Sequence, residues 1–128
     1  MTGTATSGRA DIAAALTAAG LTAFASTPST MPLPCVVLTP DSPYLELVSI
    51  GSALTYRIGI KAQINAPALD NAAALEVVET LADSVIEALP SGVTASTLSA
   101  PRLDSLGQGQ GSIYTADLTL TALITKEQ

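Results

Sequence analysis

The chain of 128 residues contains no histidine and no tryptophan, and its only cysteine is Cys35. Histidine is the side chain that most often transfers protons near neutral pH, so its absence removes most classes of enzyme. The chain likewise has no Cys–His, Ser–His or metal-ligand cluster. A single cysteine excludes an intrachain disulfide, and the apolar run that begins at Cys35 favours a buried, unreactive thiol. We therefore expect no catalytic residue, no bound metal and no cofactor.

Carboxylates are the remaining candidates for chemistry. Glu79 and Asp83 are spaced to lie close together on a helix, where two carboxylates can share a divalent ion or act as acid and base. Such sites usually lie in clefts lined with aromatic side chains, and only 3% of this chain is aromatic. The sequence favours a protein that is not an enzyme. An acid-dependent hydrolase or a metal enzyme stays open as an alternative.

Basic residues are also scarce, because 5 Lys and Arg stand against 11 Asp and Glu and leave a net charge of −6. They are scattered along the chain, at Arg9, Arg57, Lys61, Arg102 and Lys126. Nonspecific affinity for nucleic acid requires clustered Lys and Arg, so a grip on phosphate backbones is not expected. No basic leader precedes an apolar segment, and no apolar run approaches the roughly 20 residues that span a bilayer. We expect a protein made in the cytosol, without membrane contact.

The length fits one domain with a single core. Residues 1–8 contain Thr, Gly and Ser without periodicity and are predicted to form either a flexible leader or an arm that orders only on contact. Residues 9–128 are predicted to form one α+β domain. Since 48% of the chain is apolar but only 3% is aromatic, its core must consist of Ala, Val, Leu and Ile.

Periodicity and turn residues predict the order of elements. The predicted helices span 9–19 and 70–89, and the predicted strands span 21–25, 35–39, 44–50, 52–65, 93–98 (continued by 102–106) and 112–125. The prolines in 26–34 predict a loop, and Pro40-Asp41-Ser42-Pro43 predicts a turn. Short links favour antiparallel pairing. We therefore expect a mainly antiparallel sheet of four to five strands with two helices packed on one face.

The central strand alternates strictly between apolar and polar residues. One side carries Leu54, Tyr56, Ile58, Ile60, Ala62 and Ile64, whereas the other carries Thr55, Arg57, Gly59, Lys61, Gln63 and Asn65. The last strand alternates in the same way, with Tyr114, Ala116, Leu118, Leu120, Ala122 and Ile124 on one side. The apolar sides are predicted to form the core, and the other sides face water or a partner.

The long helix has a buried stripe and an acidic one. The predicted buried stripe is Ala74, Leu75, Val78, Leu81, Ala82, Val85 and Leu89, and the opposite stripe is Glu76, Glu79, Thr80, Asp83 and Glu87. No Lys or Arg within the helix relieves the repulsion among these acids. The stripe is either a solvated face or a face that meets basic groups of a neighbouring subunit. Arg57 and Lys61, which project from one side of the central strand, are either solvated or the partners of that stripe.

A glycine-rich segment separates the last two strands. It consists of Gly107, Gln108, Gly109, Gln110 and Gly111. The segment lacks the Lys and the strand-to-helix context of a phosphate-binding loop, so it is predicted to be a hairpin tip.

The order of these elements resembles the tail terminator proteins of long-tailed bacteriophages. The resemblance covers Arg9 to Thr125 and consists of the Ala-rich first helix, the run Pro34-Cys35-Val36-Val37-Leu38, the strand that ends in Ala62-Gln63-Ile64-Asn65, the long helix and the alternating last strand. Small neck and head-completion proteins of the same phages share this size and character. A protein-binding α+β module that acts as a monomer is a further alternative.

The resemblance implies a structural protein of the virion at the junction of tail and neck. Such a protein forms a ring, commonly a hexamer, that caps the tail tube, stops its polymerisation and joins it to the head–tail connector or neck proteins. In that case Arg57, Lys61, Glu76, Glu79, Asp83 and Glu87 are candidates for subunit contacts, and residues 1–8 and 107–111 are candidates for contacts with the tube or connector. DNA would pass an acidic lumen without specific binding, because like charges repel.

Overall fold

A computed structural model describes residues 4–26, 33–49, 53–67, 71–105 and 112–127 of the chain. These residues form an α+β fold with two helices, α1 (Thr4–Ala18) and α2 (Asn71–Ala88), and one sheet of six strands. The strands are β1 (Ala23–Phe24), β2 (Cys35–Ser49), β3 (Ala53–Pro67), β4 (Val93–Leu98), β5 (Arg102–Ser105) and β6 (Ser112–Glu127). The predicted fold class is confirmed. The predicted four to five strands are too few, because the short strands β1 and β5 also join the sheet.

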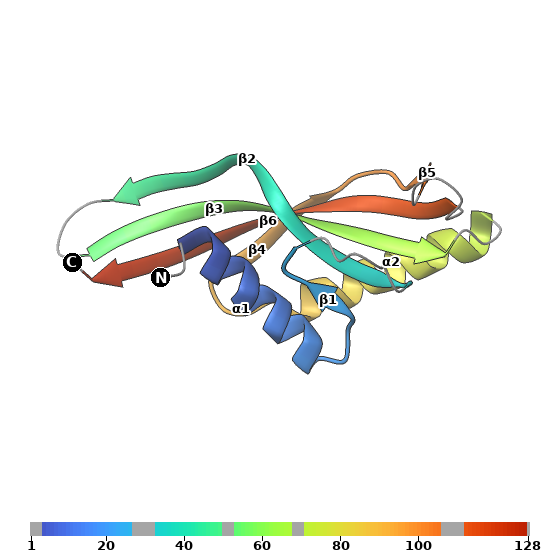
Figure 1. The fold of residues 1–128 in the computed structure, drawn as a ribbon, viewed down its shortest axis with the longest axis horizontal. Helices are drawn as coiled ribbons and strands as arrows, with labels where there is room; N and C mark the ends of the chain where they lie inside the picture. The colour runs from blue at the N-terminus through green and yellow to red at the C-terminus, as the bar shows by residue number, and fades with distance from the viewer. Residues whose placement is uncertain (1–3, 27–32, 50–52, 68–70, 106–111, 128) are drawn as a thin grey trace.

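The sheet is built around β3 and β6 (Figure 1). Its strand order is β1-β2-β3-β6-β4, and β5 pairs with β6 as well. Only β1 and β2 are parallel; the other pairs are antiparallel. Because β3 and β4 both run antiparallel to β6, they run parallel to each other. Helix α2 therefore serves as the crossover between them, as parallel strands require.

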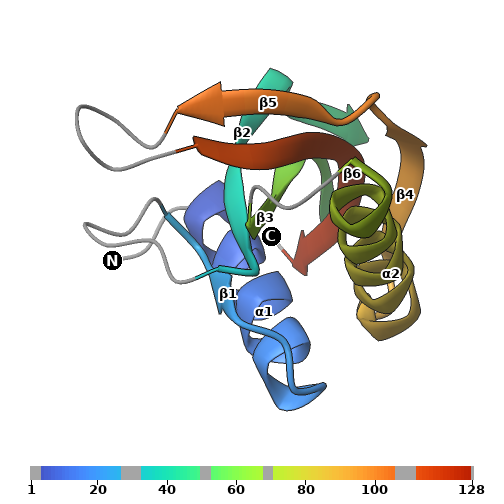
Figure 2. The same ribbon diagram turned by 90° about the vertical axis from the view of Figure 1, so that its right-hand side faces the viewer.

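The core lies between the sheet and the two helices, which cover the same face (Figures 1 and 2). Its members come from both helices and the three long strands: Ile12, Leu16, Val36, Leu38, Ile58, Ile60, Ala62, Ile64, Ala66, Val78, Ala82, Val85, Ala116, Leu118, Leu120 and Ala122. The alternation in β3 and β6 places these side chains on one side, as predicted. On α2, however, Leu75 is exposed although the helical repeat predicted its burial.

Strand β2 continues through the segment that was predicted to be a turn. Pro40 pairs with Ile60 and Leu45 pairs with Ile58, so residues 41–44 bulge out opposite Gly59. Proline is tolerated at an edge or a bulge because the missing N–H is then not needed by a neighbouring strand. The two predicted strands 35–39 and 44–50 are thus one strand with an irregularity.

Helix α1 begins at Thr4, earlier than the predicted start at Arg9, so residues 4–8 of the predicted leader are helical. Gly8 lies in this first part of the helix. A Cβ atom there would lie 3.2 Å from the Cδ1 atoms of Ile58 and Ile124, so the helix can approach the sheet closely at this point.

The three long strands extend beyond the helices at one end of the sheet (Figure 1). At about 1.5 Å per residue, α2 with 18 residues is about 27 Å long. At about 3.3 Å per residue, β6 with 16 residues is about 53 Å long. The helices therefore leave part of the sheet bare even on their own side.

A smaller buried cluster lies on the opposite face of the sheet. Cys35, Val37, Asn65, Ile113 and Thr115 are all buried there, although the alternation predicted the last three to face outward. The Asn65 Nδ2 atom donates to the Gln63 carbonyl at 3.3 Å and lies 3.8 Å from the Cys35 Sγ atom. Burial raises the pKa of the Cys35 thiol, and the hydrogen bond from Asn65 opposes this rise.

We predict that Cys35 reacts with thiol reagents only when the protein unfolds. Because its pKa is higher in the folded state than the ordinary 9.0, the neutral thiol contributes stability below that pH, and the contribution is lost as the pH rises above it. The free energy of unfolding should therefore fall more steeply in this alkaline range for the natural protein than for Cys35→Ala. The assignment would be contradicted if urea titrations showed that the free energy of unfolding falls equally with pH in both proteins. Equal thiol reactivity with and without urea would also contradict it.

Candidate assembly surfaces

The outer face of α2 is acidic. Burial of Ala74, Val78, Ala82 and Val85 fixes which side of the helix meets the sheet, and Glu76, Glu79, Asp83 and Glu87 are exposed on the other sides. Within the described parts of the chain, none of these four carboxylates forms an ion pair. The exposed side chains of Leu75 and Ile86 add apolar area to the same helix. The predicted acidic stripe is therefore present, and no cation of the described residues neutralises it.

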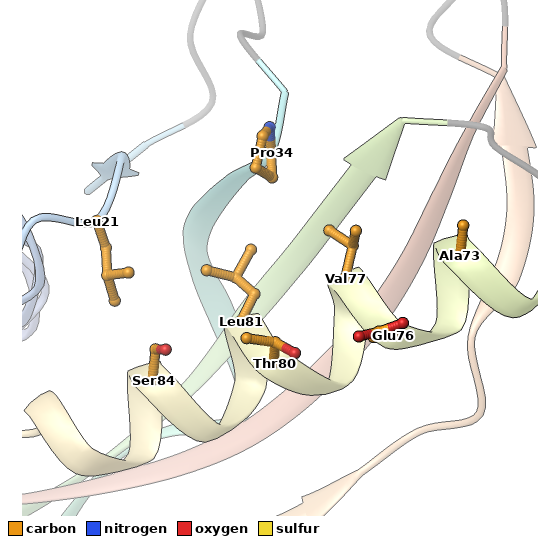
Figure 3. A pocket seen from close by; sticks show the side chains of 8 residues that line it. All are labelled: Leu21, Pro34, Ala73, Glu76, Val77, Thr80, Leu81 and Ser84. Atoms are coloured by element: carbon orange, nitrogen blue, oxygen red, sulfur yellow. The ribbon is translucent and has the colours of Figure 1, made fainter.

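A groove runs along α2 (Figure 3). Its volume is about 470 Å³, and it is lined by Leu21, Pro34, Ala73, Glu76, Val77, Thr80, Leu81 and Ser84. Leu21 and Pro34 come from segments beside β1 and β2, so the groove separates these segments from the helix (Figure 3). A smaller hollow of about 240 Å³ shares Leu21 and Ser84 and extends to Glu87. The combined depression is mainly apolar with a carboxylate toward each end.

Arg57 and Lys61 lie on the face of the sheet that carries no helix. The Arg57 Nη1 atom lies 3.6 Å from the Glu46 Oε1 atom on β2, so Arg57 already has a partner within its own chain. Both side chains are about half exposed, and such a pair contributes little to stability. Lys61 forms no ion pair with any described residue. Since the sheet separates Lys61 from α2, a contact between Lys61 and the acidic stripe requires a second molecule.

The bare end of the sheet is a surface that the sequence analysis did not identify. On the helix side of β2, Leu45 is 47% exposed and Leu47 is 48% exposed. Val48 is 45% exposed, and Leu123 on β6 is 51% exposed. The signal in the sequence was the apolar run in 44–50, but only the exposure of Leu45, Leu47 and Val48 in the structure shows that the described helices leave them uncovered.

The remaining predicted contact residues lie outside the described parts of the chain. Gly107, Gln108, Gly109, Gln110 and Gly111 belong to this group, as do residues 1–3 of the predicted leader. Within the described residues, no three or more Cys, Asp or Glu side chains are grouped so that they could hold a metal ion. The described helices include none with the length and apolarity to cross a membrane.

Neither a protein-family model nor a curated protein matches this chain. The functional argument therefore depends on the fold and on the surfaces described above.

We predict that removing the charge of Glu87 stabilises the isolated protein. Glu87 lies in the last turn of α2, where the helix dipole disfavours an anion, and it is four residues from Asp83. Glu87→Gln should raise the free energy of unfolding in urea by about 0.5 kcal/mol. The matched control Glu76→Gln, nearer the start of the helix, should gain less. A loss of stability in Glu87→Gln would mean that this carboxylate has an attractive partner and that the stripe is neutralised.

Proposed function

We propose that this protein is a tail terminator of a long-tailed bacteriophage. In this proposal, copies of the chain form a closed ring, commonly a hexamer, at the junction of tail and neck. The ring caps the tail tube, stops its polymerisation and joins it to the head–tail connector. The observation that carries the proposal is the incomplete cover of the sheet: the two described helices cover only part of one face, neither of them covers the other face, and one end stays bare.

A terminator needs unlike surfaces, because each copy contacts two neighbours, the tube and the connector. A ring is closed by a heterologous contact, in which two different patches of the chain meet. This small fold offers an acidic helix face, a sheet face with many threonines and Lys61, and an exposed apolar end. An ordinary interface buries on the order of 800 Å² on each partner. Such surfaces are of little use to a protein that acts alone.

The composition supports the same function. Only 12% of the residues are charged, and the net charge is −6. A low density of charge favours burial in protein contacts, because charged groups are depleted at the centre of interfaces. The excess of acids disfavours binding of DNA, which has to pass a terminator freely. The described elements also follow the order on which the resemblance rests.

The groove along α2 favours a second candidate, a protein-binding module that acts as a monomer. Its volume of about 470 Å³ falls within the range of ordinary binding pockets, and its lining is mainly apolar. Another neck or head-completion protein of the same phages would use similar surfaces. The position of the gene separates these candidates, because a terminator gene is expected between the genes of the connector and the tail tube.

We predict that charge reversal on α2 impairs capping. Asp83→Lys places a cation in the acidic stripe, which disrupts contacts with basic groups of a partner. Reconstituted tail tubes, viewed by electron microscopy, should stay short and capped with the natural protein and should elongate with Asp83→Lys. The control Asp11→Lys makes the same charge change on an exposed position of α1.

Two results would contradict the proposal. In the first, the natural protein leaves the length of the tubes unchanged. In the second, it stays a single chain of 12.9 kDa with and without the tube protein. Normal capping by Asp83→Lys would show instead that the acidic stripe takes no part in it.

A further inference from the structure

We propose that neighbouring copies join by pairing the open edge of β2 in one copy with the open edge of β6 in the next copy. The sheet would then continue from subunit to subunit around the ring. This inference rests on the proposed function, in which the chain forms a ring. It assigns the contact that closes that ring.

The edge of β2 lacks a partner over most of its length. Among the described strands, β1 is the only one beside this edge, and it pairs with Val36 and Val37 alone. The Val36 N–H group donates to the Thr22 carbonyl at 2.9 Å, so it points away from β3. Backbone groups of an antiparallel strand alternate between its two neighbours. Val36 pairs with Ile64, so the backbone groups of Ile64 point away from β2 and toward β6. By alternation, the other even-numbered residues of β3 also direct their backbone groups toward β6.

The same alternation identifies the open groups after the bulge. Leu45 pairs with Ile58 and Leu47 pairs with Tyr56, and both partners are even-numbered residues of β3, like Ile64. The backbone N–H and C=O groups of Leu45 and Leu47 therefore point away from β3, toward the open edge. Pro40, which pairs with Ile60, is also an outward residue, so its missing N–H removes no bond to β3.

The edge of β6 is open at the same end of the sheet. The Leu123 N–H group donates to the Gly92 carbonyl at 2.9 Å, on the side of β4. Alternation then directs the backbone groups of Thr125 and Glu127 to this side, beyond the last residue that β4 pairs, Ala122. No described strand lies beside them. Two unpaired edges, one on each side of the sheet, thus lie near its bare end (Figure 1).

The edge of β2 after the bulge lacks the usual protection against pairing. Natural proteins guard open edges with prolines or charges, especially lysine. Pro40 and Pro43 guard the first part of β2, but residues 45–48 contain three exposed apolar side chains and one charge, Glu46. Arg57 already neutralises that charge at 3.6 Å. A second strand could therefore lie beside residues 45–48 without burying an unpaired ion.

A second copy of the chain fits both edges at once. A foreign strand beside β2 would leave β6 open, and a two-fold dimer through β2 would do the same. Both β2 and β6 run antiparallel to β3, so they run parallel to each other. Rotation about the ring axis does not reverse the direction of a strand. We therefore predict that β2 of one copy and β6 of the next copy pair in parallel. Repeating it gives the order β2-β3-β6-β2-β3-β6 around a closed ring without a free edge at this end.

Disulfide trapping tests the pairing directly. Glu46 and Leu123 both pair with Arg57, and Thr125 pairs with Thr55. All three side chains therefore lie on the face of the sheet without helices. Adjacent strands bring such side chains within the roughly 4.4–6.8 Å between Cα atoms that a disulfide requires. Mild oxidation of Glu46→Cys/Leu123→Cys, or of Glu46→Cys/Thr125→Cys, should give a ladder of covalent oligomers that ends at the size of the ring. Each single variant should stay a monomer on a denaturing gel, since Cys35 is buried.

A variant of the apolar end gives a second test. Leu47→Lys places a charge on an exposed position of β2, so the monomer should keep its circular dichroism and its midpoint in urea. Light scattering should show no ring at concentrations where the natural protein forms one. The control Leu103→Lys alters another exposed leucine, on β5, and should form rings normally.

The outcomes separate this inference from the proposed function. Normal rings from Leu47→Lys would overturn the inference alone. Covalent dimers of the single variant Glu46→Cys would overturn it in favour of a two-fold contact between β2 strands. A further outcome is that Lys61→Cys/Glu79→Cys cross-links and neither double variant of the β2 and β6 edges does. That outcome would replace edge pairing with packing of α2 on the sheet face of the neighbouring copy, and the proposal of a ring would be kept. If the natural protein never self-associates, with or without tail-tube protein, both proposals fail.

Discussion

Pairing between β3 and β6 runs without a break from Ala53 and Glu127 to Pro67 and Ile113. The even-numbered residues of both strands form the floor of the core, and a slip of one residue would turn all of them to the other face. This pairing also positions β2, which pairs with β3, and the two helices, which pack on the even-numbered residues. The same ladder also determines the exposed surfaces, because the strands are about twice as long as the helices that cover them.

The mismatch in length links the fold to the proposed function. Where the helices cover the sheet, the apolar side chains are buried and the domain has its core. Beyond the helices, Leu45 and Leu47 continue the same apolar face into solvent, and the adjacent edges have no partner among the described strands. A single copy cannot bury this end. Association of copies would bury it and would pair the backbone groups of both edges.

The sequence predicted the parts of the fold that depend on local periodicity. The alternation in β3 and β6 and the helical repeat of α2 identified these elements and most of the core. The turn predicted at Pro40–Pro43 was wrong, because Pro40 lies at an outward position of an edge strand, where a missing N–H is tolerated, and the following residues form a bulge within the same strand. The burial of Asn65 and Thr115 was also missed, since it depends on what lies over the sheet and not on the pattern of the strand.

The candidate contacts were predictable only in part. The acidic stripe of α2 follows from helical spacing alone and is exposed as predicted. Arg57 was predicted to be either solvated or a partner for a neighbouring copy, but Glu46 lies opposite it on β2, and only the register reveals this pairing. Whether Lys61 meets the acids of another copy stays a prediction. The open edges were not identified from the sequence, because an edge is defined by strand order.

Hydrogen exchange at the amides of Leu45, Leu47 and Thr125 tests the central claim most directly, since it compares the same backbone groups in free and assembled protein. The account predicts fast exchange in dilute protein, where these amides have no partner, and strong protection after assembly. Contradiction would come from amides that exchange equally fast in both states, or that are already protected in the single chain.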